Sequence, residues 1–262
     1  MAHVRIIIEY DGTDFCGWQI QPGRRTVQGE IEDALKRLTG KAVRITGAGR
    51  TDTGVHARGQ VAHFQELSEL PLSRLQKALN AMTGDDVYVK QVDRVAEDFH
   101  SRFSAVSKTY CYSILQVPSP LRNRYAWYTS FTLDVPSMKR VIPSLLGTHD
   151  FKHFSVHNGN ENTECCLKKI DITEAHSELC ICIEGDRFLR KMMRGIIGFL
   201  YDVGRGRFAS RDIDAALAGN VPDLYFVPTC GLVLCSVQYP DRYVIEDNPE
   251  NNVQFRSEHE DT

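Results

Sequence analysis

The chain has 262 residues, of which 42% are hydrophobic and 25% are charged, and its formal net charge is −3. This composition excludes a fibrous or an intrinsically disordered protein, and the length predicts one or two domains with a sizeable core. The start has no signal-peptide h-region and no apolar run is long enough to cross a bilayer, so we expect a cytoplasmic protein.

The first half alternates strands and helices in the order β-α-β-β-α-β, which is the order of ferredoxin-like folds. Thr26 is placed to cap the first helix and Gly40 to end it, and Ser73 is the candidate cap of the second. The expected strands lie at 4–12, 43–49, 59–66 and 86–95, and the expected helices at 26–40 and 72–84.

The second half repeats this order without visible sequence identity. Its expected strands lie at 108–116, 168–176, 178–185 and 231–239, and its helices at 137–147, 187–204 and 210–219, the first of them interrupted by Pro143. We therefore predict an α+β protein with two ferredoxin-like (RRM-like) lobes, residues 1–105 and 106–240. Their mixed, mainly antiparallel sheets would lie side by side around a central cleft.

The charges are distributed unevenly along the chain. Residues 241–262 carry seven acidic and two basic residues, a net charge of −5, so the preceding 240 residues carry +2. This acidic tail has too little apolar content to fold alone, and we expect it to be disordered. Residues 187–211 instead predict a basic helix that can bind phosphates, since a single acid, Asp202, accompanies seven basic residues. These are Arg187, Arg190, Lys191, Arg194, Arg205, Arg207 and Arg211.

The eight cysteines are expected to be buried free thiols, because most lie in strand-like runs of a mid-sized chain without a secretory signal. They are Cys16, Cys111, Cys165, Cys166, Cys180, Cys182, Cys230 and Cys235. A metal site is not expected. His149, His153 and His157 recur every four residues, which would align them on a helix, but there is no Cys-x-x-Cys and no His-Glu-x-x-His motif.

The stretch from Ile45 to Phe64, ITGAGRTDTGVHARGQVAHF, holds Arg50 and Asp52 in a loop with four glycines, Gly47, Gly49, Gly54 and Gly59. Glycines at this density indicate tight turns or the close approach of another group. A simpler interpretation is an Asx-type turn, tied by Thr51 and Thr53, with a structural Arg–Asp pair. His56 is a weak candidate for a general base and equally fits a role in holding the turn, whereas His63 is expected to be packed in the following strand.

This loop resembles the signature of the tRNA pseudouridine synthase A family, in which the aspartate of the G-R-T-D-x-G-V-H core is the catalytic carboxylate. Four further stretches resemble the family's blocks in the same order: IEYDGTDFCGWQIQP, DFHSRFSAVSKTYCYSI, GTHDFKHF and RFLRKMMRGIIGFL. The resemblance extends from about Val4 to Tyr239. It departs from the family's pattern at Pro143, at FVPTCGLVL before the last strand, and in the acidic tail.

The resemblance implies that Asp52 is the nucleophile and that Arg50 helps to extrude the target nucleotide. It further implies that Tyr110 packs against the target base and that Arg194 pairs with the aspartate. The family is cofactor-free, cytoplasmic and homodimeric. Its substrate is the anticodon stem-loop of tRNA, where uridines on the 3′ side (positions 38 to 40) are isomerised.

Simple chemistry is compatible with these roles, because isomerising uridine needs no redox step and no external group. An ionised carboxylate can attack C1′ of the sugar or C6 of the base, or remove a proton from C2′, and the sequence does not select among the three. Arg190 and Lys191, in the predicted basic helix, are expected to bind tRNA.

Two other classes of protein compete with this interpretation. An RNA-binding module of RRM-like architecture would use aromatic side chains exposed on strand faces and has no need of Asp52. A retaining glycosidase would need a second carboxylate at roughly 5 Å, for which Glu9 and Asp14 are the candidates.

Overall fold

The computed structural model describes residues 3–65, 70–157, 159, 162–221 and 223–243. Ten strands and five α-helices alternate along these residues, so the protein belongs to the α+β class, as predicted. Within the same residues, no helix is long and apolar enough to cross a membrane. The acidic tail is predicted to be disordered, and its residues from 244 onwards lie outside the described part of the chain.

The first half follows the predicted order. It contains β1 (His3–Tyr10), α1 (Val27–Thr39), β2 (Thr46–Gly47), β3 (His56–Gln65), α2 (Leu72–Met82) and β4 (Val87–Val95). Thr26 caps α1 by accepting a hydrogen bond from the Gly29 N–H, and Gly40 ends the helix at φ 70°, as predicted. The prediction of Ser73 as the cap of α2 is wrong. Pro71 occupies the cap position instead, and its rigid φ starts the helix before the serine.

The second half keeps the predicted order of its main elements and adds short ones. It contains β5 (Ser107–Leu115), β6 (Trp127–Tyr128), α3 (Val135–Leu145), β7 (Gly147–Asp150), β8 (Glu164–Ala175), β9 (Glu178–Gly185), α4 (Met192–Gly204), α5 (Ile213–Leu217) and β10 (Leu232–Gln238). Pro143 does not interrupt α3, because it lies in the last turn, where the missing N–H removes a single helical bond.

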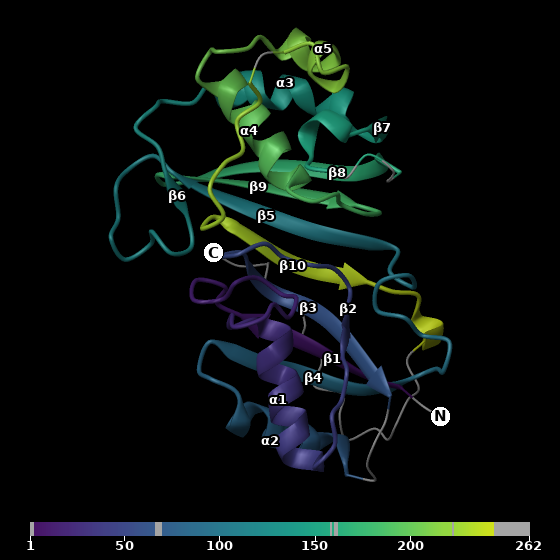
Figure 1. Cartoon of the computed structure of the whole chain (residues 1–262). Helices are drawn as coiled ribbons and strands as arrows, with labels where there is room; N and C mark the ends of the chain where they lie inside the picture. Colours follow the sequence, from purple (N-terminus) through teal and green to yellow (C-terminus); the bar gives the residue numbers. More distant parts are fainter. Residues whose placement is uncertain (1–2, 66–69, 158, 160–161, 222, 244–262) are drawn as a thin grey trace.

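Strands of both halves join in one sheet with the order β4-β1-β3-β10-β5-β9-β8-β7, while β2 pairs with β3 and β6 with β5. The halves meet where β10 pairs in parallel with β3, at Val233 with His56 and Leu234 with Ala57. Most other pairs are antiparallel. In Figure 1, α1 and α2 lie beside β1, β3 and β4, and α3, α4 and α5 lie at the opposite end near β8 and β9. The loop between β2 and β3 therefore lies near the junction of the halves.

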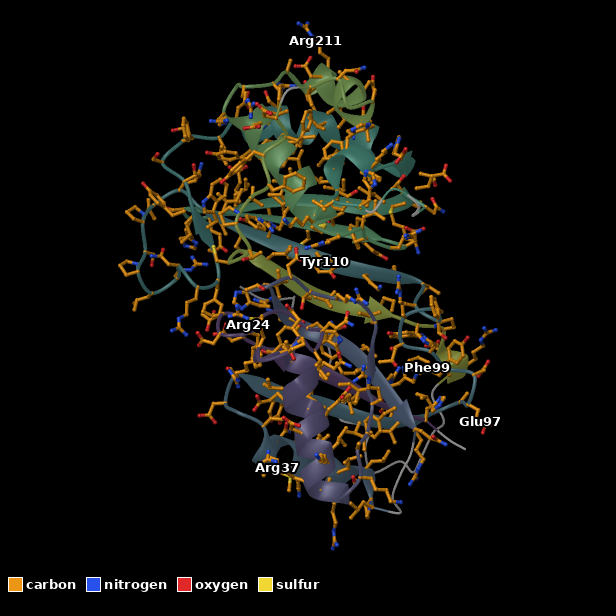
Figure 2. All side chains as sticks on the ribbon, in the orientation of Figure 1. Arg24, Arg37, Glu97, Phe99, Tyr110 and Arg211 are labelled. Atoms are coloured by element: carbon orange, nitrogen blue, oxygen red, sulfur yellow. A yellow bond between two sulfur atoms is a disulfide. The ribbon has the colours of Figure 1, made fainter. Side chains whose placement is uncertain are left out.

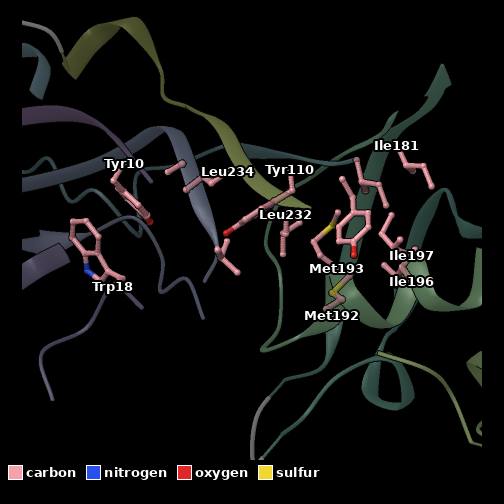
Figure 3. Packing of buried hydrophobic residues seen from close by; sticks show 14 of the residues in the cluster. Tyr10, Trp18, Tyr110, Ile181, Met192, Met193, Ile196, Ile197, Leu232 and Leu234 are labelled. Carbon is pink, nitrogen blue, oxygen red and sulfur yellow. The ribbon is translucent and has the colours of Figure 1, made fainter. Parts of the chain in front are cut away.

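One hydrophobic core runs through both halves, and Figure 3 shows its central part. A smaller cluster contains Ala48, Val61, Val95, Phe99 and Tyr243. Tyr243 belongs to a short 3₁₀ helix, Asp241–Tyr243, and its ring lies 5.5 Å from that of Phe99. The first three residues of the predicted tail are thus a packed element, because the buried ring of Tyr243 joins this cluster.

The expectation of free thiols is wrong for Cys111 and Cys182, which form a disulfide between β5 and β9. The two residues are directly opposite each other in the antiparallel register, with their Cα atoms 4.0 Å apart. Sheet register brings them together, and no local spacing in the sequence reveals it. The other six cysteines carry free thiols.

Candidate active site

The loop at 48–55 joins β2 to β3, and hydrogen bonds to β3 and within the loop hold its backbone on both sides of Asp52. Before the aspartate, Gln60 Nε2 donates to the Gly49 carbonyl over 3.0 Å. After it, the Val55 N–H donates to the Asp52 carbonyl over 3.2 Å. The loop therefore presents the aspartate from a fixed backbone.

Thr51 connects this loop to the N-terminal strand. The side chain is buried, and its hydroxyl lies 2.8 Å from the hydroxyl of Tyr10, which ends β1. The Thr51 carbonyl also accepts the Trp18 N–H over 3.1 Å. Burial raises the pKa of Tyr10 to about 12, so the phenol stays protonated and can donate to Thr51. This threonine fixes the loop against another segment rather than tying a local Asx turn.

The glycines in and beside the loop make room for protein groups and for a tight turn. A Cβ on Gly47 would lie 2.6 Å from the Trp18 ring, and one on Gly59 would lie 2.6 Å from the Cys235 carbonyl. Gly54 adopts φ 77°, a left-handed conformation that side chains rarely adopt. Their effect on function is to shape the loop that carries Asp52.

Arg194, on α4, is the ion-pair partner of Asp52, with 3.8 Å between Nη1 and Oδ2. Its Nε donates to the Val227 carbonyl over 2.6 Å, which aims the guanidinium. In the part of the chain that the structure describes, the Asp52 carboxylate accepts no hydrogen bond from a threonine and forms no pair with Arg50. The aspartate side chain is 32% exposed and that of Arg194 is 18% exposed, so the pair is half-buried but open to a ligand.

Tyr110, on β5, completes this group of residues. Its side chain is buried, and its ring packs edge-on against Phe188 with centroids 5.1 Å apart. Burial, then the neighbouring Tyr10 and the negative charge of Asp52, raise the pKa of the Tyr110 phenol. Figures 2 and 3 show the tyrosine between the two halves of the molecule, with Tyr10 on one side and Met192 and Met193 of α4 on the other.

Neither candidate for a second catalytic carboxylate joins this group. Glu9 is next to Tyr10 on β1, so the two side chains point to opposite faces of the sheet, and Glu9 pairs with Lys90 at 3.1 Å. Asp14 is exposed. The arrangement therefore offers one carboxylate beside an arginine, which is not the paired-carboxylate geometry of a retaining glycosidase.

His56 holds loops together, which is the second of its two predicted roles. Its Nδ1 accepts the Gly12 N–H over 3.0 Å, and its Nε2 lies 2.8 Å from the Arg124 carbonyl and 3.2 Å from the Cys230 carbonyl. Nδ1 also lies 3.1 Å from Oδ1 of Asp11, so protein groups engage both ring nitrogens. No free nitrogen remains on this residue for a general base.

The predicted basic helix is wrong in its detail. Helix α4 begins at Met192 because Lys191 adopts φ 61°, and nearly all residues of the helix are buried. The basic residues lie instead at its two ends. At the C-terminal end, Arg205 and Arg207 bind the buried carboxylate of Asp202 at 2.7 and 2.9 Å. Arg190 is exposed and Lys191 half-exposed at the other end, the end that carries Arg194.

Arg50 lies two residues before the aspartate and is exposed. Among the described residues no ion pair or hydrogen bond holds its side chain. The loop backbone is held in place, but the guanidinium of Arg50 is not, so it is free to reach a bound ligand.

The three histidines that suggested a metal site do not share a helix. His149 lies on β7, His153 in the 3₁₀ helix Lys152–Phe154, and His157 follows it. Within the described ranges, sulfur atoms of Cys111, Cys180 and Cys182 lie within 4.8 Å of one another, but two of them form the disulfide.

One residue of this region escaped the sequence analysis. Lys108 is 9% exposed, and its Nζ donates to the Ala48 carbonyl over 2.7 Å, at the start of the catalytic-loop candidate. The alternation of SKTYCY, which puts Lys108 and Tyr110 on one face of a strand, was the signal that could have identified it.

Comparison with known proteins places this geometry in context. A family model described as "tRNA pseudouridine synthase" matches residues 6–104 and 141–240. A "tRNA pseudouridine synthase A" from Listeria welshimeri is 42% identical over 247 residues, covering 91% of this chain and 100% of that protein. Proteins of the same name from Exiguobacterium sp. and Geobacter sp. are 37% and 38% identical, covering 91% and 92% of this chain and 98% and 100% of their own lengths.

Proposed function

Because this chain belongs to the tRNA pseudouridine synthase family, and is therefore an isomerase that converts uridine to pseudouridine in tRNA, we propose that Asp52 is its catalytic carboxylate. The observation that supports this role is the 3.8 Å pair between Asp52 and Arg194, beside the buried Tyr110. The proposed substrate is the anticodon stem-loop of tRNA, with uridines on its 3′ side as targets.

The arginine has a physical task in this mechanism. When RNA covers the site, the Asp52 carboxylate loses water, and desolvation disfavours its charged form. Arg194 offsets this loss with a positive charge, and the bond from its Nε to Val227 keeps that charge directed at the aspartate. The carboxylate then remains ionised to act at C1′, at C6 or on the C2′ proton.

The target nucleotide must leave the helical stack before the aspartate can reach it, which costs a few kcal/mol. We propose that the free guanidinium of Arg50 occupies the vacated place in the stack, while Tyr110 packs against the extruded base. Stacking and cation–π contact return about 1–3 kcal/mol per base. No cofactor takes part in the proposed reaction.

Arg190 and Lys191 are proposed to bind tRNA phosphates next to the reacting uridine. Their support is that Arg190 is exposed and Lys191 half-exposed, and that they lie four and three residues before Arg194 in the chain. The proposed enzyme is a cytoplasmic homodimer that binds tRNA across both subunits. Its two ferredoxin-like lobes are residues 1–105 and 106–240, and the equivalent strand orders β4-β1-β3 and β10-β5-β9 in the two halves support this division.

The test is to replace Asp52 with Asn, which keeps the size of the side chain but cannot serve as nucleophile or base. We expect no detectable pseudouridine in an unmodified tRNA transcript, with tRNA affinity within a few-fold of the wild type, because phosphates supply most of the affinity. Chemical mapping of pseudouridine locates the modified position. Asp14→Asn is the matched control and should retain activity. Turnover near the wild-type rate by the Asp52→Asn variant would refute the assignment.

A further inference from the structure

Lys108 is a buried cation that neither the proposed chemistry nor the family resemblance uses. It lies on β5, two residues before Tyr110 and on the same face of the strand. Its residue is 9% exposed, and a lysine this buried requires a partner for its ammonium group. The partner is the Ala48 carbonyl, 2.7 Å from Nζ.

The bond joins two segments whose relative position determines the geometry of the proposed site. Ala48 belongs to the loop that carries Asp52, whereas Lys108 belongs to the strand that carries Tyr110. One strand of the second half thus binds the catalytic loop through the lysine, and the same strand carries Tyr110, whose pKa the charge of Asp52 helps to raise. A cationic donor makes the first contact stronger than a neutral hydrogen bond.

We propose that Lys108 is a positioning residue, which sets the separation of Asp52 and Tyr110 by holding the Ala48 carbonyl. This inference rests on the proposed function of Asp52. The lysine does not touch the reacting atoms. Loss of the lysine is expected to leave the catalytic side chains chemically intact but to change the distance between them.

The charge of Lys108 also responds to pH in the range where enzymes are assayed. Burial, then the positive charges of Arg102 and Arg187, lower the pKa of the ammonium to about 8, while Asp186 opposes them. Below that pH the group is charged and binds the carbonyl strongly. Above it the neutral amine binds more weakly, so the wild-type turnover should fall as pH rises through about 8.

Three variants test the proposal on an unmodified tRNA transcript. Lys108→Met should lower kcat by about 10- to 100-fold, because displacement of a reacting group by about 1 Å costs that much. Its KM should change little. Lys108→Arg should restore part of kcat and remove the alkaline limb near pH 8, since an arginine stays charged. Lys90→Met is the matched control, because Lys90 Nζ also donates to a backbone carbonyl, that of Arg58 at 3.1 Å, away from the loop.

Hydrogen exchange of the protein alone gives a readout that does not depend on activity. The amides of Ala48 and Val55, which donate to the Val61 and Asp52 carbonyls, should exchange faster by about tenfold in Lys108→Met than in the wild type or in Lys90→Met. Unchanged kcat with unchanged exchange would overturn the proposal. So would an alkaline limb in Lys108→Arg identical to the wild-type limb, which is the decisive measurement if Lys108→Met fails to fold. A wild-type protein that forms no pseudouridine would refute the proposed function instead, and the exchange comparison would still test the lysine.

Discussion

At the scale of single residues, the environment decides what each ionisable group does. Asp52 and Arg194 form an ion pair that is open to a ligand, and Asp202 forms one with Arg205 in which the carboxylate is fully buried. The second pair has a structural task, since a buried charge needs a partner. The same distinction separates His56, whose two nitrogens are both engaged, from a histidine that could transfer protons.

His63 provides a prediction about stability. It is buried on β3, as the sequence predicts, and its Nδ1 lies 2.9 Å from the Ser101 hydroxyl. Burial, followed by the neighbouring His100 and His3, lowers its pKa to about 4. The unfolded chain, with a pKa near 6.5, binds the proton more readily, so folding stability is complete above pH 6.5 and falls as pH drops towards 4.

Protonation of this histidine is expected to lower the free energy of unfolding by about 3 kcal/mol as the pH falls from 6.5 to 4. The variant His63→Gln, which cannot titrate, should show a flatter dependence of stability on pH. Urea unfolding at several pH values measures both curves. Parallel curves for the two proteins would contradict the pKa assigned to His63.

At the scale of elements, α4 and β5 bring the second half of the chain to the loop of the first. Helix α4 is buried along its length and presents Arg194 near its first turn. Strand β5 presents Tyr110 on one face and Cys111 on the other, where it is linked to β9. A disturbance of β5 is therefore expected to reach the site.

The N-terminal end of α4 is predicted to bind tRNA. Arg190→Ala combined with Lys191→Ala should weaken binding and reduce the slope of log K against log salt by about 2, because each phosphate contact contributes about 0.9. Titration of tRNA at several salt concentrations measures the slope. Arg211→Ala is the control, since this exposed arginine lies at the far end of the molecule in Figure 2. Equal slopes for the double variant and the wild type would place the RNA elsewhere.

The disulfide is predicted to stabilise the fold when it forms. It joins residues 71 positions apart, and closing a loop of this length restricts the unfolded chain by about 4 kcal/mol. Peptide mapping without reductant should recover Cys111 linked to Cys182. The melting temperature should then fall after reduction in the wild type, but not in Cys182→Ser. A reduced and an oxidised wild type with the same melting temperature would contradict this account.

At the scale of the whole molecule, one sheet and one main core span both halves. Separating the halves would therefore expose strand edges and core side chains at the junction. Strand β10, near the end of the chain, lies between β3 and β5 and completes this sheet. The C-terminal region is thus part of the fold as far as Tyr243, which packs against Phe99.

Two truncations test where the folded part ends. Deleting residues 244–262 should leave the melting temperature and activity unchanged, because the composition of that segment predicts no core of its own. Deleting residues 241–262 also removes Tyr243 and should lower the melting temperature by a few degrees. Thermal unfolding of both proteins makes the comparison. Equal melting temperatures would show that the tyrosine adds nothing, and a large loss in the shorter deletion would show that the acidic segment is packed.

The sequence by itself determined what depends on neighbours along the chain. The caps of α1 and the order of the main elements follow from hydrophobic periodicity and from residues such as Thr26 and Gly40, whose effects act within one helical turn. The quoted loop likewise made Asp52 the candidate catalytic carboxylate and indicated the family. Only the tertiary structure decided which other distant residues meet: Lys108 with Ala48, Cys111 with Cys182, and Tyr243 with Phe99. The first two contacts depend on strand register, because a shift of one residue would turn Lys108 and Cys111 of β5 to the opposite faces of the sheet.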